Sequence, residues 1–157
     1  MDQQLSRGVS PVSPHLIVAG ATEAIAFYEK AFGAKLLIKL EGQDGKLMHA
    51  CISINGSSVM LMDENVPWKT LGPKTLGGTP VVIHLMVEDA DAFAGQAIAA
   101  GATVILPVSD MFWGDRYGIV ADPFGHHWSI ATPVRNMTEA EIKIAAAQAM
   151  CGENVPA

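Results

Sequence analysis

The sequence predicts an α+β fold built from two consecutive βαβββ modules. An internal repeat is the first observation, because the segments beginning at His15 and His84 resemble each other and lie 69 positions apart. Hairpin signals are the second: Asn55-Gly56 in one half and Asp122-Pro-Phe-Gly125 in the other. The third is an apolar β-rich run that leads into a helical pattern in each half. Since one such half cannot bury both faces of its sheet, the halves must pack together or with a second chain.

The first module is predicted to begin with a strand over residues 12–18. A helix follows, because Ile25, Tyr28 and Phe32 share one face and Gly33 is a typical helix end. The next three apolar runs predict strands over 35–41, 46–54 and 57–63.

The second module repeats this order after a strand over residues 81–87. Its helix is expected to open at Asp89, to carry Asp91 in the first turn and to end at Gly101. Strands are then predicted over 103–108, 115–122 and 126–132.

Two segments lie outside the repeat. Residues 64–79 are rich in Gly and Pro and are predicted to link modules 11–63 and 80–134, with enough length for pairing within a chain or exchange between chains. The single domain is thus expected over 11–134, followed by a helical tail over 135–157. In that tail Thr138 to Glu141 form a helix start, and one side carries Ile142, Ala145, Ala146 and Ala149. We interpret the tail as a packing helix on a dimer or a sheet edge.

Composition narrows the class of protein. The 157 residues are 50% hydrophobic and 17% charged, which indicates a folded domain. A net charge of −6 disfavours nucleic acid and anionic membranes as partners. No apolar run is long enough to span a membrane and the start lacks a signal-peptide pattern, so a cytoplasmic location is expected. Cys51 and Cys151 do not suggest a disulfide framework.

Two motifs carry a family resemblance. They are the strand-to-helix entry Leu16 to Tyr28, followed by Phe32-Gly-Ala34, and the run from Trp113 to His126 that contains Asp122-Pro-Phe-Gly-His126. Over residues 11–134 the chain resembles the vicinal oxygen chelate superfamily, which includes glyoxalase I, bleomycin-resistance proteins and extradiol dioxygenases. Within it the chain looks most like the PhnB-like branch. The resemblance implies a curved sheet around a central cleft and a homodimer.

The resemblance also implies where a metal would bind. Its four ligand positions, one on the first and last strand of each module, fall on Ser13, Met60, Val82 and Ser129. None is His, Glu or Asp, and this set suits a divalent ion poorly. We therefore expect no metal and no cofactor at this position. A divalent metal at a non-standard site built from His15, His49, His84 and Cys51 is the alternative, since imidazole and thiolate are zinc ligands.

Strand alternation predicts which side chains face the cleft. In the strand over 46–54, Met48, Ala50, Ile52 and Ile54 are expected to face the helices, and in the strand over 115–122 Arg116, Gly118 and Val120 are expected to face the cleft. Arg116 is then expected to pair with Asp115 or Asp122, or with an anionic ligand. Trp113 is the best candidate to cover a ligand. The predicted ligand-binding residues are His15, His49, Met60, His84, Met86, Trp113, Arg116 and Ser129.

Three functions fit these residues. The first is a protein that binds a small organic molecule, with any anionic group held by Arg116. A second is a lyase or isomerase that uses His15 or His84 as its base. The third is a regulatory or structural dimer with a vestigial cleft.

Overall fold

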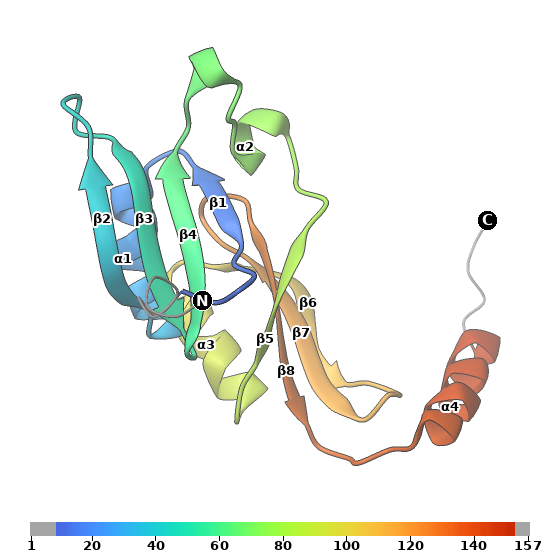
Figure 1. Cartoon of the computed structure of the whole chain (residues 1–157). Helices are drawn as coiled ribbons and strands as arrows, with labels where there is room; N and C mark the ends of the chain where they lie inside the picture. The colour runs from blue at the N-terminus through green and yellow to red at the C-terminus, as the bar shows by residue number, and fades with distance from the viewer. Residues whose placement is uncertain (1–8, 153–157) are drawn as a thin grey trace.

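A computed structural model describes residues 9–152 and contains two four-stranded mixed sheets (Figure 1). The strand order is β1-β4-β3-β2 in the first sheet and β5-β8-β7-β6 in the second. The first module comprises β1 (His15–Val18), α1 (Ala21–Phe32), β2 (Lys35–Glu41), β3 (Leu47–Ile54) and β4 (Ser57–Asp63). The second comprises β5 (Val82–Met86), α3 (Ala90–Ala100), β6 (Thr103–Asp110), β7 (Asp115–Ala121) and β8 (His127–Pro133). The βαβββ duplication is therefore confirmed.

Local signals set the helix ends as expected. Helix α1 ends at Gly33, whose φ of 64° is a left-handed conformation that glycine adopts without strain. Helix α3 is capped by the Asp89 carboxylate, which accepts a hydrogen bond from the Ala92 N–H at 2.9 Å. The start of α1 uses a distant residue instead, because Asp63 at the end of β4 accepts hydrogen bonds from the Gly20 and Ala21 N–H groups.

The two modules share one hydrophobic core. Helices α1 and α3 pack against each other, and Trp128 of β8 lies against α1, with its ring centroid 4.8 Å from Phe32 and 5.5 Å from Tyr28. The Tyr28 hydroxyl donates to the buried Asp122 carboxylate at 2.7 Å. In this structure the modules therefore pair within one chain.

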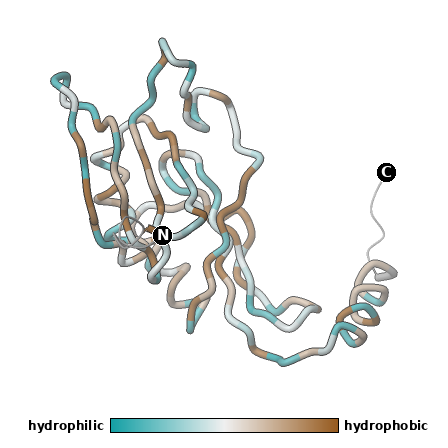
Figure 2. Tube along the Cα trace, viewed as in Figure 1, coloured by the Kyte–Doolittle hydropathy of each residue, from teal (hydrophilic) through white to brown (hydrophobic). Residues whose placement is uncertain are grey.

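Each sheet presents one face to the helices and one away from them, which we call the outer face. In the first sheet Leu16, Val18 and Leu61 are buried toward the helices, whereas His15 and Met60 lie on the outer face. Figure 2 shows hydrophobic residues along strands of both sheets, including β2 at the sheet edge.

The prediction that Met48 faces the helices is wrong. Its side chain is 62% exposed and Leu47 is buried instead. The reason is a register shift in the β2–β3 pairing, where Leu40 pairs with His49 but Glu41 pairs with Leu47.

The expected orientation of β7 was also wrong, because the repeat slips by one residue there. His15 pairs with Met60 and His84 with Ser129, which preserves the offset of 69. Met60 also pairs with Cys51, but Ser129 pairs with Ile119, which is only 68 positions beyond Cys51. A one-residue slip reverses the face of every side chain.

Consequently Arg116 and Gly118 lie on the helix-facing side of β7 with the buried Val120. Tyr117 and Ile119 take the outer face instead.

The connecting segment is more ordered than its composition suggests, and the tail forms the predicted helix. Residues 64–79 contain two short helices, η1 (Val66–Trp68) and α2 (Pro73–Leu76), that the sequence did not predict. The tail forms α4 (Glu139–Gly152), which Figure 1 shows held away from both sheets. None of the helices within residues 9–152 is long and apolar enough to cross a membrane.

Candidate functional site

The candidate site lies where the first strands of the two modules approach each other. A cavity of about 540 Å³ is lined by Ser13 and His15 from one module and by their repeat equivalents Val82 and His84 from the other. His126 also lines it, and its Nε2 lies 3.0 Å from the Ile17 carbonyl oxygen. The structure thus brings together two of the predicted histidines and adds a third, His126, which is not among the predicted site residues.

His84 is held by three outer-face neighbours. Its Nδ1 lies 2.8 Å from the Ser129 hydroxyl and its Nε2 lies 3.1 Å from the Met86 sulfur. The imidazole stacks on Tyr117 with the ring centroids 6.2 Å apart. Such contacts fix the plane of the imidazole and leave little freedom for its rotation.

Trp113 extends this cluster. Its ring centroid is 5.5 Å from that of Tyr117, and its indole N–H donates to the Asp115 carboxylate at 3.0 Å. The structure therefore groups Trp113 with the predicted residues His84, Met86 and Ser129. Tyr117 was missed because the 69-residue offset assigned it to the wrong face.

Two further predicted residues, His49 and Met60, lie on the outer face of the first sheet. His49, Cys51 and Met60 line a second cavity of about 430 Å³, together with Val9, Leu37, Ile38 and Leu40. The rings of His15 and His49 are 5.9 Å apart and nearly perpendicular. Partial burial, followed by repulsion from His49, lowers the pKa of His15 below its usual value, which favours the neutral imidazole at neutral pH.

The thiol of Cys51 is not activated. The residue is buried, and burial raises the pKa of its thiol. A protonated thiol is a weak nucleophile and a weak metal ligand. Cys51 therefore contributes a small apolar surface to the lining of the second cavity.

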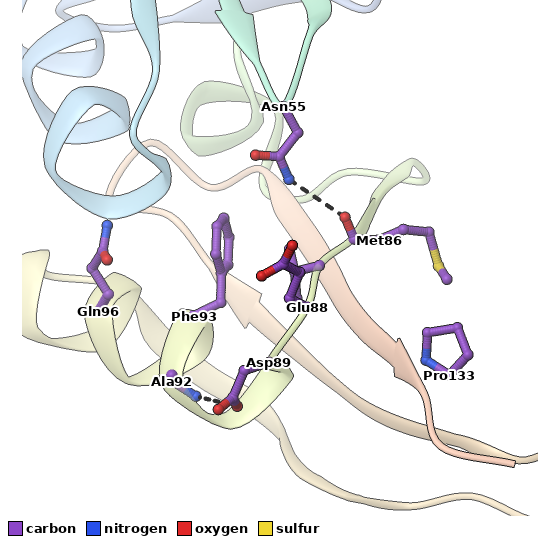
Figure 3. A pocket seen from close by; sticks show the side chains of 9 residues that line it. Asn55, Met86, Glu88, Asp89, Ala92, Phe93, Gln96 and Pro133 are labelled. Atoms are coloured by element: carbon purple, nitrogen blue, oxygen red, sulfur yellow. Dashed lines mark hydrogen bonds between the residues drawn. The ribbon is translucent and has the colours of Figure 1, made fainter.

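A third cavity, of about 640 Å³, lies between the end of β5, helix α3 and the turn after β3 (Figure 3). The Asn55 amide donates to the Met86 carbonyl oxygen at 3.4 Å across its rim. Met86 is the only predicted ligand-binding residue in its lining, which otherwise consists of Asn55, Val87, Glu88, Asp89, Ala92, Phe93, Gln96 and Pro133.

The residues at the metal position that the resemblance implies do not fit a divalent ion. The Ser13 hydroxyl is hydrogen-bonded to the Ser58 hydroxyl and to the Ser10 carbonyl oxygen, and the Ser129 hydroxyl is engaged by His84. Val82 has no donor atom. Within the described part of the chain, no group of three or more His, Cys, Asp or Glu residues is placed to hold a metal. In particular, His15, His49, His84 and Cys51 do not form such a group.

Arg116 is outside these cavities. Its guanidinium donates to the Asp91 carboxylate at 2.6 and 2.7 Å and to Asp110 at 3.1 Å. The prediction that Arg116 pairs with Asp115 or Asp122 is therefore wrong. Asp91 is in α3, opposite the helix-facing side of β7, so the error follows from the one-residue slip. The hydrogen bonds and charge of Asp91 and Asp110 raise the pKa of Arg116 further, and those of Arg116 lower the pKa of Asp91.

Comparison with known proteins supports the assignment of the chain to a protein family. The uncharacterized protein Rv0887c of Mycobacterium tuberculosis is 54% identical over 138 residues, which cover 85% of this chain and 81% of that protein. Protein YjdN of Escherichia coli is 28% identical over 141 residues, which cover 76% of this chain and 93% of that protein.

Among solved structures, TioX from Micromonospora sp. ML1 is similar with a TM-score of 0.64 and 27% identity, covering 80% of this chain and 99% of that one. The family model described as "Glyoxalase/Bleomycin resistance protein/Dioxygenase superfamily" matches residues 10–130, which include both modules and the candidate site. With its two βαβββ modules and this match over most of its length, the chain belongs to the glyoxalase/bleomycin resistance protein/dioxygenase superfamily.

Proposed function

We propose that this chain binds a small organic molecule at the junction of β1 and β5 without a metal ion. The observation that carries the proposal is the 540 Å³ cavity, which brings the equivalent residues His15 and His84 to one space. Cavities of this size are typical of small-molecule sites. The poor ligand chemistry of Ser13, Met60, Val82 and Ser129 supports a site that works without a divalent ion.

The lining suggests a neutral, partly apolar ligand. Val12, Val82 and Ile83 provide apolar surface, and imidazoles provide a few polar contacts. The sequence suggested an anionic group held by Arg116, but that guanidinium is already paired with two carboxylates on the opposite side of the sheet. We therefore do not include Arg116 in the site or a negative charge in the ligand.

A cavity-filling substitution tests this location. Val82 is 44% exposed and lines the cavity, so Val82→Trp should block the site while leaving the core intact. Val104→Trp on β6 is the matched control, because Val104 is 43% exposed and lies outside the cavity. A library of neutral aromatic and heterocyclic compounds would be screened by thermal shift, and hits would be measured by calorimetry on all three proteins.

We expect hits to bind the parent chain and the Val104→Trp variant alike and to lose about tenfold or more in affinity with Val82→Trp. Equal binding to both variants would place the ligand elsewhere. Elemental analysis that found one tightly held divalent metal per chain would contradict the metal-free site.

A lyase or isomerase is the second candidate function, favoured by the lowered pKa of His15. A neutral imidazole can accept a proton from a bound substrate at neutral pH. Turnover of a screened compound that disappears in His15→Gln, while binding is retained, would favour the enzyme over the binding protein.

The proposal has two further parts, the oligomeric state and the location of the protein. A homodimer is supported by the unpaired edge strands β2 and β6, which carry exposed apolar side chains. A cytoplasmic location stays a prediction from the sequence.

A further inference from the structure

Soft metal-ligating side chains gather on the outer face of the first sheet. In the strand pairing, Met60 of β4 lies opposite both His15 of β1 and Cys51 of β3. His49 is two positions from Cys51 on the same strand, and it lines the 430 Å³ cavity together with Met60 and Cys51. Two imidazoles, a thioether and a thiol therefore share one patch of this sheet.

The spacing of the two imidazoles matches that of rings bound to one metal ion. Their centroids are 5.9 Å apart and the rings are nearly perpendicular. A metal–nitrogen bond is about 2 Å long, so two imidazoles on one ion hold their centroids about 5 to 6 Å apart. Strand β4 lies between the strands that carry His15 and His49, and Met60 is on the same face of that strand.

The imidazoles of the first sheet have nitrogen atoms available for an ion. Within residues 9–152, neither His15 nor His49 has a side-chain hydrogen-bond partner. His84 differs, because its two ring nitrogens are already engaged by Ser129 and Met86. A metal ion needs an unoccupied nitrogen lone pair, so the first sheet suits an ion better than the second does.

The surroundings favour a soft monovalent ion. The other residues that line the cavity have apolar side chains and are Val9, Leu37, Ile38 and Leu40. Mg²⁺ and Ca²⁺ take oxygen ligands, whereas thioether sulfur selects Cu(I). A monovalent ion with neutral ligands also brings less charge into this apolar cavity than a divalent ion does, so its desolvation costs less.

Cys51 is the least accessible ligand of the patch. The residue is 2% exposed, and its sulfur lies 3.9 Å from the Ile52 carbonyl oxygen of its own strand. His15 is exposed, and His49 and Met60 are half-buried. An ion that arrives from solvent therefore meets the two imidazoles and the thioether first.

We infer that His15, His49 and Met60 bind one Cu(I) ion on the outer face of the first sheet. Each histidine supplies one ring nitrogen and the methionine supplies Sδ, while the apolar side chains of β2 limit the access of water to the ion. The set differs from the divalent-metal groups considered above, because a thioether replaces the third imidazole or carboxylate. The inference goes beyond the proposed function, since the organic ligand at the junction of β1 and β5 needs no ion.

Anaerobic competition with the Cu(I) chelator bathocuproine disulfonate measures the affinity of the chain for Cu(I) alone. All proteins carry Cys151→Ser, because thiols also bind Cu(I). We expect one Cu(I) per chain, and a loss of at least about tenfold in affinity with His49→Gln and with Met60→Leu. Thermal unfolding of each variant verifies that it is folded.

Two matched controls make the same chemical changes outside the cavity. They are His127→Gln on β8 and Met48→Leu on β3, and we expect each to keep the Cu(I) affinity within about twofold. An equal loss in the controls would overturn the inference, as would a chain that yields all of its Cu(I) to the competitor. Binding that disappears with Cys51→Ser but persists with His49→Gln would assign the ion to the thiol and overturn it too.

Ag(I) gives a second measurement on the Cys151→Ser chain with no further substitution. This ion has the charge and softness of Cu(I) and keeps its oxidation state in air. In long-range proton–nitrogen NMR spectra, Ag(I) should shift the ring nitrogens of His15 and His49 and leave those of His84 and His127 unchanged. Shifts confined to other histidines would contradict the site. Neither experiment uses an organic compound, so its outcome is separate from that of the binding screen.

Discussion

Each of the two modules has a histidine at the same backbone position, but the neighbouring side chains of the two histidines differ. His15 lies opposite Met60, and His84 lies opposite Ser129. The Ser129 hydroxyl is within hydrogen-bonding distance of His84, whereas His15 makes no side-chain hydrogen bond among the described residues and meets a second imidazole, His49. A structural repeat therefore preserves geometry but not chemistry, since the neighbour on the paired strand decides what each imidazole can do.

The hairpins of the two modules differ as well. Asn55 and Gly56 alone separate the paired residues Ile54 and Ser57, and both adopt a positive φ. In the second module, the five residues from Asp122 to His126 fill the loop. The shorter loop is stabilised by backbone conformation, and the longer one is organised by a buried carboxylate.

Asp122→Ala should have the largest effect. The carboxylate is 5% exposed and accepts hydrogen bonds from the Tyr28 hydroxyl, the Trp128 indole N–H and the N–H groups of Phe124 and His126. Its loss leaves buried donors unpaired, so the free energy of unfolding should fall by about 3 kcal/mol or more. Urea unfolding measures this, with Asn55→Ala as the control in the other hairpin. If the two variants lost equal amounts of unfolding free energy, the buried carboxylate would not be more important to its loop than Asn55 is to the other.

Gly118→Ala should have the next largest effect. A Cβ at Gly118 would lie 2.8 Å from the Val108 side chain and 3.0 Å from the Leu106 carbonyl oxygen. The equivalent residue in the first module after the slip is Ala50, which is fully buried and carries a Cβ. We expect Gly118→Ala to cost about 1 to 3 kcal/mol of unfolding free energy.

The reverse change, Ala50→Gly, should cost about 1 kcal/mol. Thermal and urea unfolding of both variants checks the pair. If Gly118→Ala left the free energy of unfolding unchanged, strands β3 and β7 would be packed alike at these positions.

Alkaline pH should weaken the contact between modules. Burial, followed by the charge and hydrogen bond of Asp122, raises the pKa of Tyr28 well above 10.0. The unfolded tyrosine therefore loses its proton first, and stability should decline as pH rises above about 10. Tyr28→Phe should cost about 1 kcal/mol at neutral pH and should flatten this decline. Unfolding curves from pH 8 to 11 test both, and an identical slope in the variant would exclude Tyr28 as the cause.

Mild acid should have the smallest effect, confined to the first module. The pKa of His15 is lowered in the folded state, so the unfolded chain binds the proton more readily and stability falls as pH drops below about 6.5. His49→Gln removes the second, smaller cause and should move the pKa of His15 upward. Proton NMR titration of the imidazoles measures this directly. An unchanged His15 titration in the variant would show that desolvation alone lowers its pKa.

Most elements could be predicted from the sequence because their signals are local. The helix ends at Gly33 and Gly101, the cap at Asp89 and the 69-residue repeat each depend on residues close together in the chain. The outer-face positions of His15, Met60, His84 and Ser129 followed from strand alternation within that repeat.

Only the tertiary structure decided which side chains of β7 meet the site. The hairpin loops differ by an odd number of residues, so one offset could not describe both central strands, and the slip exchanged Arg116 for Tyr117 on the outer face. The partners of Arg116 likewise came from α3 and β6, at the far side of the sheet. The sequence by itself determined the modules, the helix ends and the pair of equivalent histidines, because short-range periodicity and turn chemistry specify them. Register between strands and the neighbours of each charge depend on which segments pack together, and that is a property of the folded chain alone.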